Sequence, residues 1–452
     1  MHNKLVKNFY INLLRFKSFN VLPFLFSIII LLIYSKYLTV LTWGTDYAGY
    51  INLAKALNDG AISEYVESRL LLTSYTTTTS EPVYTPIGFS IIILLTSFIH
   101  NWNVLIIKLI TPLICIGLYF LITNMFNKKY EKILTFTILL NPFYIDQFRN
   151  ITTELVALFF LLLGIHLSKF KFIYFIISVL IRPSFFVFVS IYLFFDYLKK
   201  RNAKEILNFL TVLISIQIFL NYYLKINFYG MYTLTESGNS NFALLFENLL
   251  NFELNNLKLI IYEFGRIFST VSHPINTFIG LLVICILLFT NNSYGYMSLG
   301  FLSFHLVWIN YDYARFFLPL VVLVSLSIFT KLRSMNLNNL IIKFLLIMSL
   351  LLLVPYGYLI NYRISLLDTQ RGPYQIESQD LFSHINNNYE DGLFSFHSAR
   401  VFTLFTGLES YKIQNTIQEN TIIICELEQK DCIIPPNYKN VFDNKLYRIY
   451  EP

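Results

Sequence analysis

Two carboxylates stand where this chain passes between apolar and polar sequence, a place suited to acid–base chemistry. Asp46 lies just past the first apolar segment, and Glu154 lies at the start of a later one. A carboxylate beside a bound hydroxyl group can take its proton, and a carboxylate at the start of an apolar helix is costly and usually functional. Asp46 also suits a helix N-cap, and both roles can hold together. We predict that Asp46 and Glu154 are catalytic.

Arginines near the same boundaries are candidate ligands for an anion. Arg182 precedes a proline in the middle of an apolar segment, and Arg315 begins another one. Arginine binds phosphate through two parallel hydrogen bonds and keeps its charge, and the alternative for both residues is a side chain that extends toward the lipid headgroups. Arg149 shares a turn between two apolar segments with Asp146 and Glu154. These three groups either pair with one another or contribute to a binding site.

The composition is that of a membrane protein with many spans. Hydrophobic residues make up 55% of the 452 residues and charged residues only 13%, whereas soluble domains are about 25% charged. The formal net charge of +7 comes from short basic clusters between apolar runs, which indicates positive loops on the cytoplasmic side. We therefore expect membrane lipids as partners and no nucleic acid.

Apolar segments and basic clusters together predict an α-helical polytopic topology. The run 86–100 is short for a helix that must cross about 30 Å of hydrocarbon, and placing it along the membrane puts every basic cluster on the cytoplasmic side. Proline breaks a helix, so we expect 171–198 to form a hairpin of two short helices with Arg182 at its outer tip. The result is about 11 transmembrane helices, with the N-terminus cytoplasmic. The expected spans lie near 20–41, 103–125, 131–147, 151–168, 171–198 (two helices), 204–225, 273–290, 294–311, 313–331 and 338–360.

This topology divides the chain into two domains. Residues 1–360 form the membrane domain, and residues 361–452 form a small extracytoplasmic α/β domain. The membrane domain has large outer loops at 42–102 and 226–272. Apolar spacing over 242–250, in the second loop, predicts an amphipathic helix on the membrane surface.

The four cysteines fall into two groups. Cys115 and Cys285 lie inside apolar runs, where we expect packing residues. Cys425 and Cys432 lie in the C-terminal domain, and they are either two separate thiols or a disulfide that closes a hairpin.

Several short motifs follow one another in an order that resembles a known family. They are Asp46-Tyr47…Ala54, Pro82-Val83-Tyr84-Thr85-Pro86, Asn141-Pro142…Thr153-Glu154, Arg182-Pro183, Tyr313…Arg315-Phe316…Pro319 and His397-Ser398-Ala399-Arg400…Gly407. In this order the chain resembles the GT-C superfamily of integral-membrane glycosyltransferases. The resemblance is to the bacterial branch near the protein O-mannosyltransferases and the lipid A aminoarabinose transferase.

The resemblance implies an inverting transfer of a single sugar from a polyprenyl-phosphate donor to an outer-face acceptor, which is a glycan, a lipid or a protein. Asp46 matches the catalytic base of the family, and Glu154 matches a second acidic position. Arg182 and Arg315 match basic positions that lie near the lipid phosphate in the family. The predicted substrate-binding residues are Tyr84, Arg149, Arg182 and Arg315.

No cofactor is expected, because the phosphate-linked lipid is itself the activated donor. Relatives differ in their use of a divalent cation, and this sequence has no decisive cluster of metal ligands, so we predict a metal-independent reaction. The expected location is the bacterial inner membrane. Two other functions fit a chain of this class: a surface-glycan polymerase and a non-enzymatic flippase or transporter of lipid-linked sugars.

Overall fold

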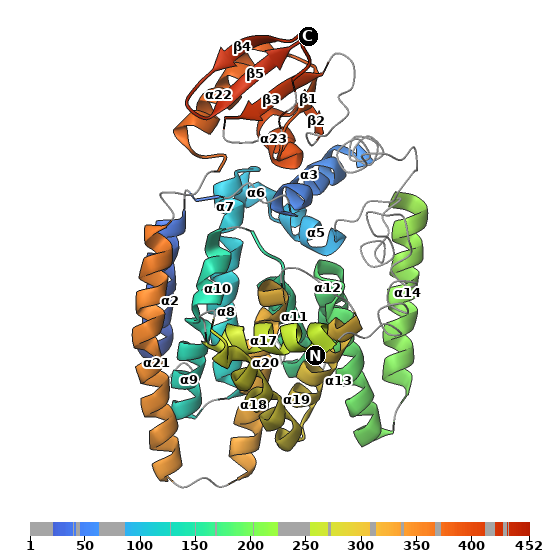
Figure 1. Cartoon of the computed structure of the whole chain (residues 1–452). Coiled ribbons are helices and arrows are strands. Elements are labelled where there is room, and N and C mark those ends of the chain that lie inside the picture. Colours follow the sequence, from blue (N-terminus) through green and yellow to red (C-terminus); the bar gives the residue numbers. More distant parts are fainter. Residues whose placement is uncertain are drawn as a thin grey trace.

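The protein is a bundle of helices with a small sheet at its C-terminal end (Figure 1). The computed structural model describes residues 21–38, 40–41, 46–62, 86–126, 128–149, 151–167, 170–201, 203–224, 254–269, 273–307, 313–335, 339–366, 372–411, 421–427, 432 and 434–452. The chain is mostly helical, as the composition predicts.

The helices of the bundle follow the apolar segments of the sequence closely. They are α2 (Val21–Tyr37), α3 (Asp46–Asp59), α5 (Ile87–Leu95), α6 (Ser97–His100), α7 (Val104–Lys108), α8 (Ile110–Met125), α9 (Lys129–Leu139), α10 (Pro142–Asp146), the 3₁₀ turn η1 (Gln147–Arg149), α11 (Glu154–His166), α12 (Lys171–Ile181), α13 (Phe185–Lys200), α14 (Lys204–Leu224), α17 (Leu254–Ser269), α18 (Ile275–Thr290), α19 (Ser293–Val307), α20 (Tyr313–Ser334) and α21 (Asn339–Ser365).

Three helical stretches among the described residues are long and apolar enough to cross a membrane: Val104–Met125, Arg315–Ser334 and Leu346–Ser365. A fourth qualifies if Pro142–Arg149 and Glu154–His166, which meet at 120°, count as one broken span. Many other apolar helices are shorter than the roughly 20 residues that a straight crossing needs. The helices therefore fit a membrane protein, but they do not establish the 11 crossings predicted from the sequence.

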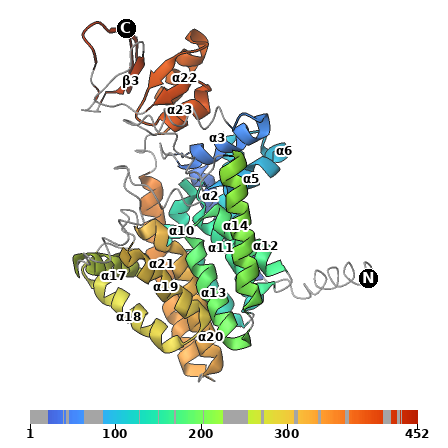
Figure 2. The same ribbon diagram turned by 90° about the vertical axis from the view of Figure 1, so that its right-hand side faces the viewer.

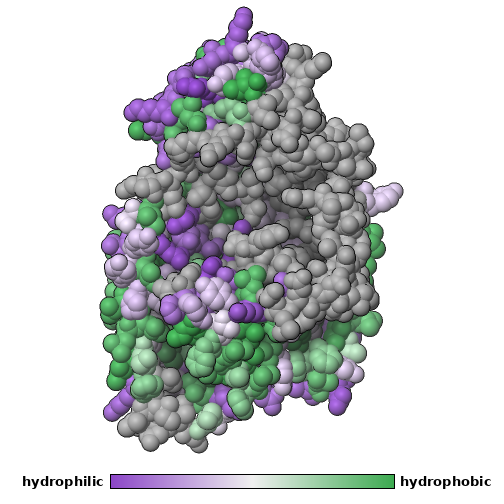
Figure 3. All heavy atoms as spheres, viewed as in Figure 1, coloured by the Kyte–Doolittle hydropathy of each residue, from purple (hydrophilic) through white to green (hydrophobic). Residues whose placement is uncertain are grey.

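The surface of the bundle supports a membrane setting. Figure 3 shows apolar residues across the lower part of the face in view, with hydrophilic residues at its bottom edge and over the C-terminal unit. Exposed large apolar side chains occur along α14, α18 and α21, and large exposed apolar surfaces mark sites of contact with a membrane or another protein.

Basic and acidic residues pair at the end of the bundle that lies away from the C-terminal sheet (Figure 1). Arg333, near the end of α20, contacts the buried Glu131 through Nε and Nη2 at 2.6 and 2.7 Å. Lys171, at the start of α12, lies 3.1 Å from Asp196 and also pairs with Glu205. Basic clusters that are distant in sequence thus gather at one end, as the charge pattern predicts.

The predicted hairpin at Arg182 is confirmed. Helix α12 ends at Ile181 and α13 begins at Phe185, so Arg182 lies in the break between them. The contact of Lys171 with Asp196 joins the start of α12 to the last turns of α13. The two helices are therefore antiparallel, with Arg182 at their shared tip.

The segment 86–100 forms two short helices and no complete span. Helix α5 has nine residues, a length of about 14 Å at 1.5 Å per residue, which is less than half of the apolar thickness of a bilayer. Gly88 allows α5 to pack directly on α12, since a Cβ atom there would lie 2.5 Å from the carbonyl carbon of Leu180. On its other side, Phe89 contacts Tyr50 of α3 edge to face, with ring centroids 5.4 Å apart.

Helix α17 occupies the end of the second large loop. Its residues Ile260, Phe264 and Ile267 are buried on one face, so the helix is amphipathic and packs into the bundle (Figure 1). Figure 2 shows α17 and α18 together on the side of the bundle away from α14. The stretch 242–250, where we predicted a surface helix, lies outside the described residues.

The C-terminal end forms a five-stranded mixed sheet with two helices, which fits the predicted α/β class. The strand order is β2-β1-β3-β5-β4, with β1 parallel to β2 and β3, and with β5 antiparallel to β3 and β4. The elements are α22 (Ile376–Asn388), β1 (Leu393–Ser395), α23 (Ala399–Thr406), β2 (Glu409–Tyr411), β3 (Ile422–Glu426), β4 (Lys439–Asp443) and β5 (Tyr447–Glu451).

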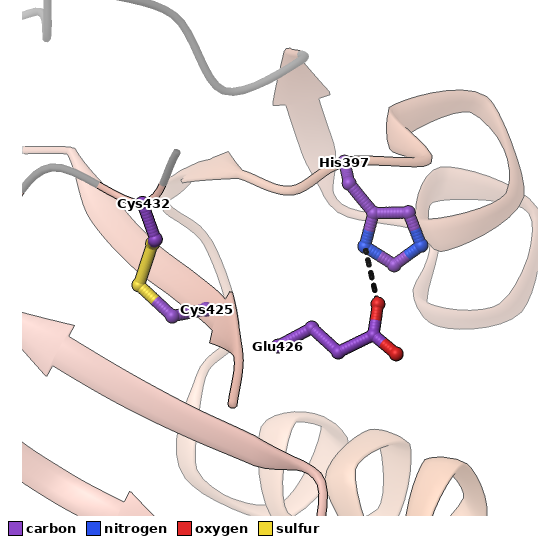
Figure 4. The surroundings of a disulfide bond; sticks show 4 residues. All are labelled: His397, Cys425, Glu426 and Cys432. Atoms are coloured by element: carbon purple, nitrogen blue, oxygen red, sulfur yellow. Dashed lines mark ion pairs between the residues drawn. A yellow bond between two sulfur atoms is a disulfide. The ribbon is translucent and has the colours of Figure 1, made fainter. Parts of the chain in front are cut away.

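This C-terminal unit has its own apolar core, built around Phe394, Phe402 and Ile424. Of the two alternatives for its cysteines, the structure contains the disulfide, between Cys425 and Cys432 (Figure 4). The division of the chain at residue 361 remains a prediction, because α21 continues to Ser365 before the unit begins.

Candidate active site

Glu154 is a carboxylate buried at the start of a helix. It is the first residue of α11, and its side chain is only 1% exposed. The backbone N–H of Thr153 donates a hydrogen bond to Oε2 at 3.1 Å. The N-terminus of a helix favours negative charge, but a lone carboxylate at this depth would still need a cationic partner.

Two arginines supply that partner. Nη2 of Arg182 lies 3.2 Å from Oε1 of Glu154, and Nε of Arg315 lies 2.7 Å from the same oxygen. Arg182 is 3% exposed and Arg315 is 23% exposed. The guanidinium of Arg182 also lies over the ring of Phe316, with 4.6 Å to its centroid, a favourable cation–π contact. We call Arg182, Glu154 and Arg315 the central triad.

The local packing explains why these three residues meet. The hydroxyl of Ser178 donates to the carbonyl oxygen of Ala157 at 2.8 Å, which joins the last turn of α12 to the first turn of α11. The hydroxyl of Tyr144 on α10 donates to the carbonyl oxygen of Leu318 at 2.6 Å, which fixes α20 one turn beyond Arg315. Two helix starts and one helix end therefore converge on a single carboxylate.

The central triad lies at the opposite end of α12 and α20 from the basic residues Lys171 and Arg333. Helix α12 carries Lys171 at its start and Arg182 at its end, and α20 carries Arg315 at its start and Arg333 near its end. Figure 1 places the triad's end of these helices below α3, α5 and the C-terminal sheet. The ion pairs of Arg182 and Arg315 are thus separated from those of Lys171 and Arg333 by the length of the helices.

The chemistry of the triad is that of an anion site. Two guanidinium groups carry charge +2 and one carboxylate carries −1, so the triad keeps a net charge of +1. Its carboxylate holds both arginines in place, and Arg315 is partly exposed. A phosphate group reaching Arg315 would meet positive charge that is already oriented. Because both arginines contact Glu154, this carboxylate is better suited to positioning them than to accepting a proton.

Asp46, the predicted base, is the first residue of α3. This helix buries Ile51, Leu53 and Ala54. The side chain of Asp46 lies outside the described structure. Burial raises the pKa of the neighbouring Tyr47 hydroxyl well above its ordinary value, so Tyr47 stays protonated at neutral pH and is not a base.

Helix α3 is connected to the triad through α5. Tyr50 of α3 contacts Phe89 of α5, and Gly88 of α5 rests on the backbone of Leu180 and Ile181, next to Arg182. These contacts place the start of the Asp46 helix and the tip of the Arg182 hairpin in one packed assembly. On its other side, α3 packs against α23 of the C-terminal unit.

Arg149 belongs to a different cluster. Its Nε atom lies 2.8 Å from Oδ1 of Asp146. Of the three groups expected either to pair or to bind a substrate, Asp146 and Arg149 therefore pair with each other, whereas Glu154 pairs with Arg182 and Arg315. Tyr84, the remaining predicted substrate-binding residue, lies outside the described residues.

Arg363, which no sequence motif singled out, lies 3.2 Å from Oδ2 of Asp146. The position of Arg363 just beyond the last apolar run is only a weak indication of a binding site, because arginines there commonly face the lipid headgroups. Within the described part of the chain, no group of three or more His, Cys, Asp or Glu side chains is arranged to hold a metal ion.

No model of a known protein family matches the chain, and no curated protein sequence shows a significant match to it.

Proposed function

We propose that this chain is a membrane glycosyltransferase of the GT-C type, which moves one sugar from a polyprenyl-phosphate donor to an acceptor hydroxyl on the outer face. The observation that carries the proposal is the central triad. It is a buried, net positive group of two arginines and one glutamate at the end of the bundle where α3 begins. The order of motifs that resembles the GT-C superfamily supports the same assignment.

In this mechanism the triad binds the phosphate of the donor lipid. Arg315, the more exposed arginine, contacts the phosphate, while Glu154 and Phe316 hold Arg182 behind it. The acceptor oxygen forms a bond to the anomeric carbon from the face opposite the phosphate. The bond from that carbon to the phosphate oxygen breaks, and the electron pair leaves with the lipid phosphate, whose growing charge the arginines stabilise.

Asp46 takes the proton of the acceptor hydroxyl during this attack. Its place at the start of α3 supports this role, because α3 packs between α5 and α23 at the boundary of the bundle and the C-terminal unit. A single displacement inverts the configuration at the anomeric carbon. No soluble nucleotide takes part, since the phosphate-linked lipid is the activated donor.

The membrane arrangement is part of the same proposal. It comprises about 11 crossings of a bacterial inner membrane, with the paired basic clusters in the cytoplasm and the C-terminal unit outside. The disulfide between Cys425 and Cys432 supports an oxidising compartment for that unit, since disulfides persist in such compartments.

The test compares Asp46→Asn with Asp59→Asn, a matched change at the exposed other end of the same helix. Membranes containing each variant receive a panel of polyprenyl-phosphate-linked sugars, and release of polyprenyl phosphate is measured. We expect Asp46→Asn to lower release by roughly 10²-fold or more and Asp59→Asn to leave it unchanged. Normal release from the Asp46 variant removes Asp46 from the mechanism.

A liposome assay of sugar movement, with no acceptor present, separates transfer from transport. Movement at full rate in the Asp46→Asn and Arg182→Gln variants would favour the flippase function over the transferase.

A further inference from the structure

A second group of arginines lies at the same end of the bundle as the central triad. Asp146, the last residue of α10, contacts Nε of Arg149 at 2.8 Å and Nη1 of Arg363 at 3.2 Å. Nη1 of Arg363 also donates to the carbonyl oxygen of Pro142 at 3.2 Å. Arg363 comes from the last turn of α21, so three elements are joined at this point.

The cluster extends to α17 through an aromatic ring. The guanidinium of Arg363 lies over Phe143 at 4.7 Å from the ring centroid, and the guanidinium of Arg266 lies over the same ring at 5.7 Å. Arg266 also pairs with Glu263 at 3.1 Å. Such contacts hold planar guanidinium groups in fixed orientations. We call Arg149, Arg266 and Arg363 the second arginine cluster.

Counted over its contacts among the described residues, this cluster has a net positive charge. Three arginines carry +3, while Asp146 and Glu263 carry −2, which leaves +1. Each guanidinium has five N–H donors, and the ion pairs within the described part of the chain use one nitrogen of each arginine. The three arginine side chains are between 18% and 28% exposed. Part of each arginine side chain is therefore accessible from outside.

The cluster borders an apolar strip along α21. Leu351, Val354, Tyr358 and Tyr362 are all exposed and recur at intervals of three or four residues, so they share one face of the helix. Arg363 follows the last of these residues at the same end of the helix, on a part of its surface about 100° away. Figure 3 shows hydrophilic residues just above the apolar residues of the lower part, over the region where Figure 1 places α10. An apolar strip that leads to a cationic group matches the two parts of a lipid molecule, the acyl chain and the headgroup.

We propose that the second arginine cluster binds the headgroup phosphate of an anionic membrane lipid, whose acyl chain lies along the exposed face of α21. The phosphate accepts hydrogen bonds from Arg266 and Arg363, which Phe143 holds in position. This binding rests on the cluster's own contacts and does not depend on the transfer reaction.

The test measures lipid retention by the purified full chain with native mass spectrometry. Phosphatidylglycerol is titrated onto the wild-type protein, Arg266→Gln, and the double variant Arg266→Gln/Arg363→Gln. The matched control is Arg448→Gln, which removes an exposed arginine that pairs with Asp443 on the C-terminal sheet. We expect the double variant to bind about tenfold more weakly or worse, because it loses the charge-assisted hydrogen bonds of two arginines, and the control to bind normally.

Equal retention by the wild-type protein and the double variant would overturn the proposal. The single variant Arg266→Gln, which leaves the Asp146 ion pairs intact, serves if the double variant loses its fold in a thermal unfolding measurement. Two further ligands identify the source of the phosphate. Phosphatidylcholine should be retained more weakly than phosphatidylglycerol, and displacement of the lipid by millimolar inorganic phosphate would assign the cluster to a free anion and refute the lipid site.

Discussion

Replacing Glu154 with glutamine tests whether the central triad is held together by charge. The substitution keeps the size of the side chain and one carbonyl oxygen, but it removes the only acidic member of the triad. Arg182, whose side chain is 3% exposed, would then be a buried cation without its carboxylate. Arg315 is better able to turn toward water or headgroups, because it is already 23% exposed.

The expected cost follows from the burial of Arg182. Breaking a buried ion pair by removing one partner costs about 3–5 kcal/mol. Because the glutamine oxygen still accepts a hydrogen bond from a guanidinium or from Thr153, we expect the lower end, about 3 kcal/mol. This is a substantial part of a folding free energy that is typically about 5–15 kcal/mol, so the variant should fold and be measurably less stable.

The assay is equilibrium unfolding in mixed micelles, with Glu131→Gln as the control. Glu131 is as buried as Glu154 and contacts one arginine through both oxygens, but that arginine, Arg333, is 34% exposed. Water can solvate Arg333 when the carboxylate is lost, and we expect a smaller cost, about 1 kcal/mol. Adding Arg182→Gln to Glu154→Gln removes the buried cation as well and should restore part of the stability.

A Glu154→Gln protein as stable as the wild type, within about 0.5 kcal/mol, would refute the reasoning. So would a double variant that is less stable than Glu154→Gln alone. Either result would mean that the carboxylate does not neutralise Arg182, and the triad would no longer explain an oriented anion site.

Two further predictions concern packing and the disulfide. Gly88→Ala places a methyl group 2.5 Å from the backbone of Leu180. We expect thermal unfolding to show that this variant loses about 1–3 kcal/mol of folding free energy. Gly357→Ala is the control: the space around Gly357 is open, so the change should be neutral or slightly stabilising. Replacing Cys425 and Cys432 with serine releases a short closed loop, and we expect limited proteolysis of the C-terminal unit to speed up in step with a loss of about 2–3 kcal/mol. Unchanged proteolysis would mean that the bond does not stabilise this unit.

Local sequence predicted several features correctly because local physics fixes them. Arg182-Pro183 breaks its helix, since proline removes a backbone donor and clashes with the preceding turn. The short run 86–100 folds as helices too short to cross. Local sequence did not predict which ionisable residues pair with one another. Glu154 was grouped with Asp146 and Arg149 because they are neighbours in sequence, yet it pairs with arginines from two other helices.

The sequence by itself determined the class of this protein. Long apolar runs that are poor in charge can only be buried as helices in a bundle or in lipid, and their few ionisable residues must stand near helix ends. Only the tertiary structure decided which of those residues meet. Gly88, Ser178 and Tyr144 fix how neighbouring helices pack, and that packing brings two arginines to one buried carboxylate. Contacts of this kind depend on the angles between helices, which no local stretch of sequence encodes.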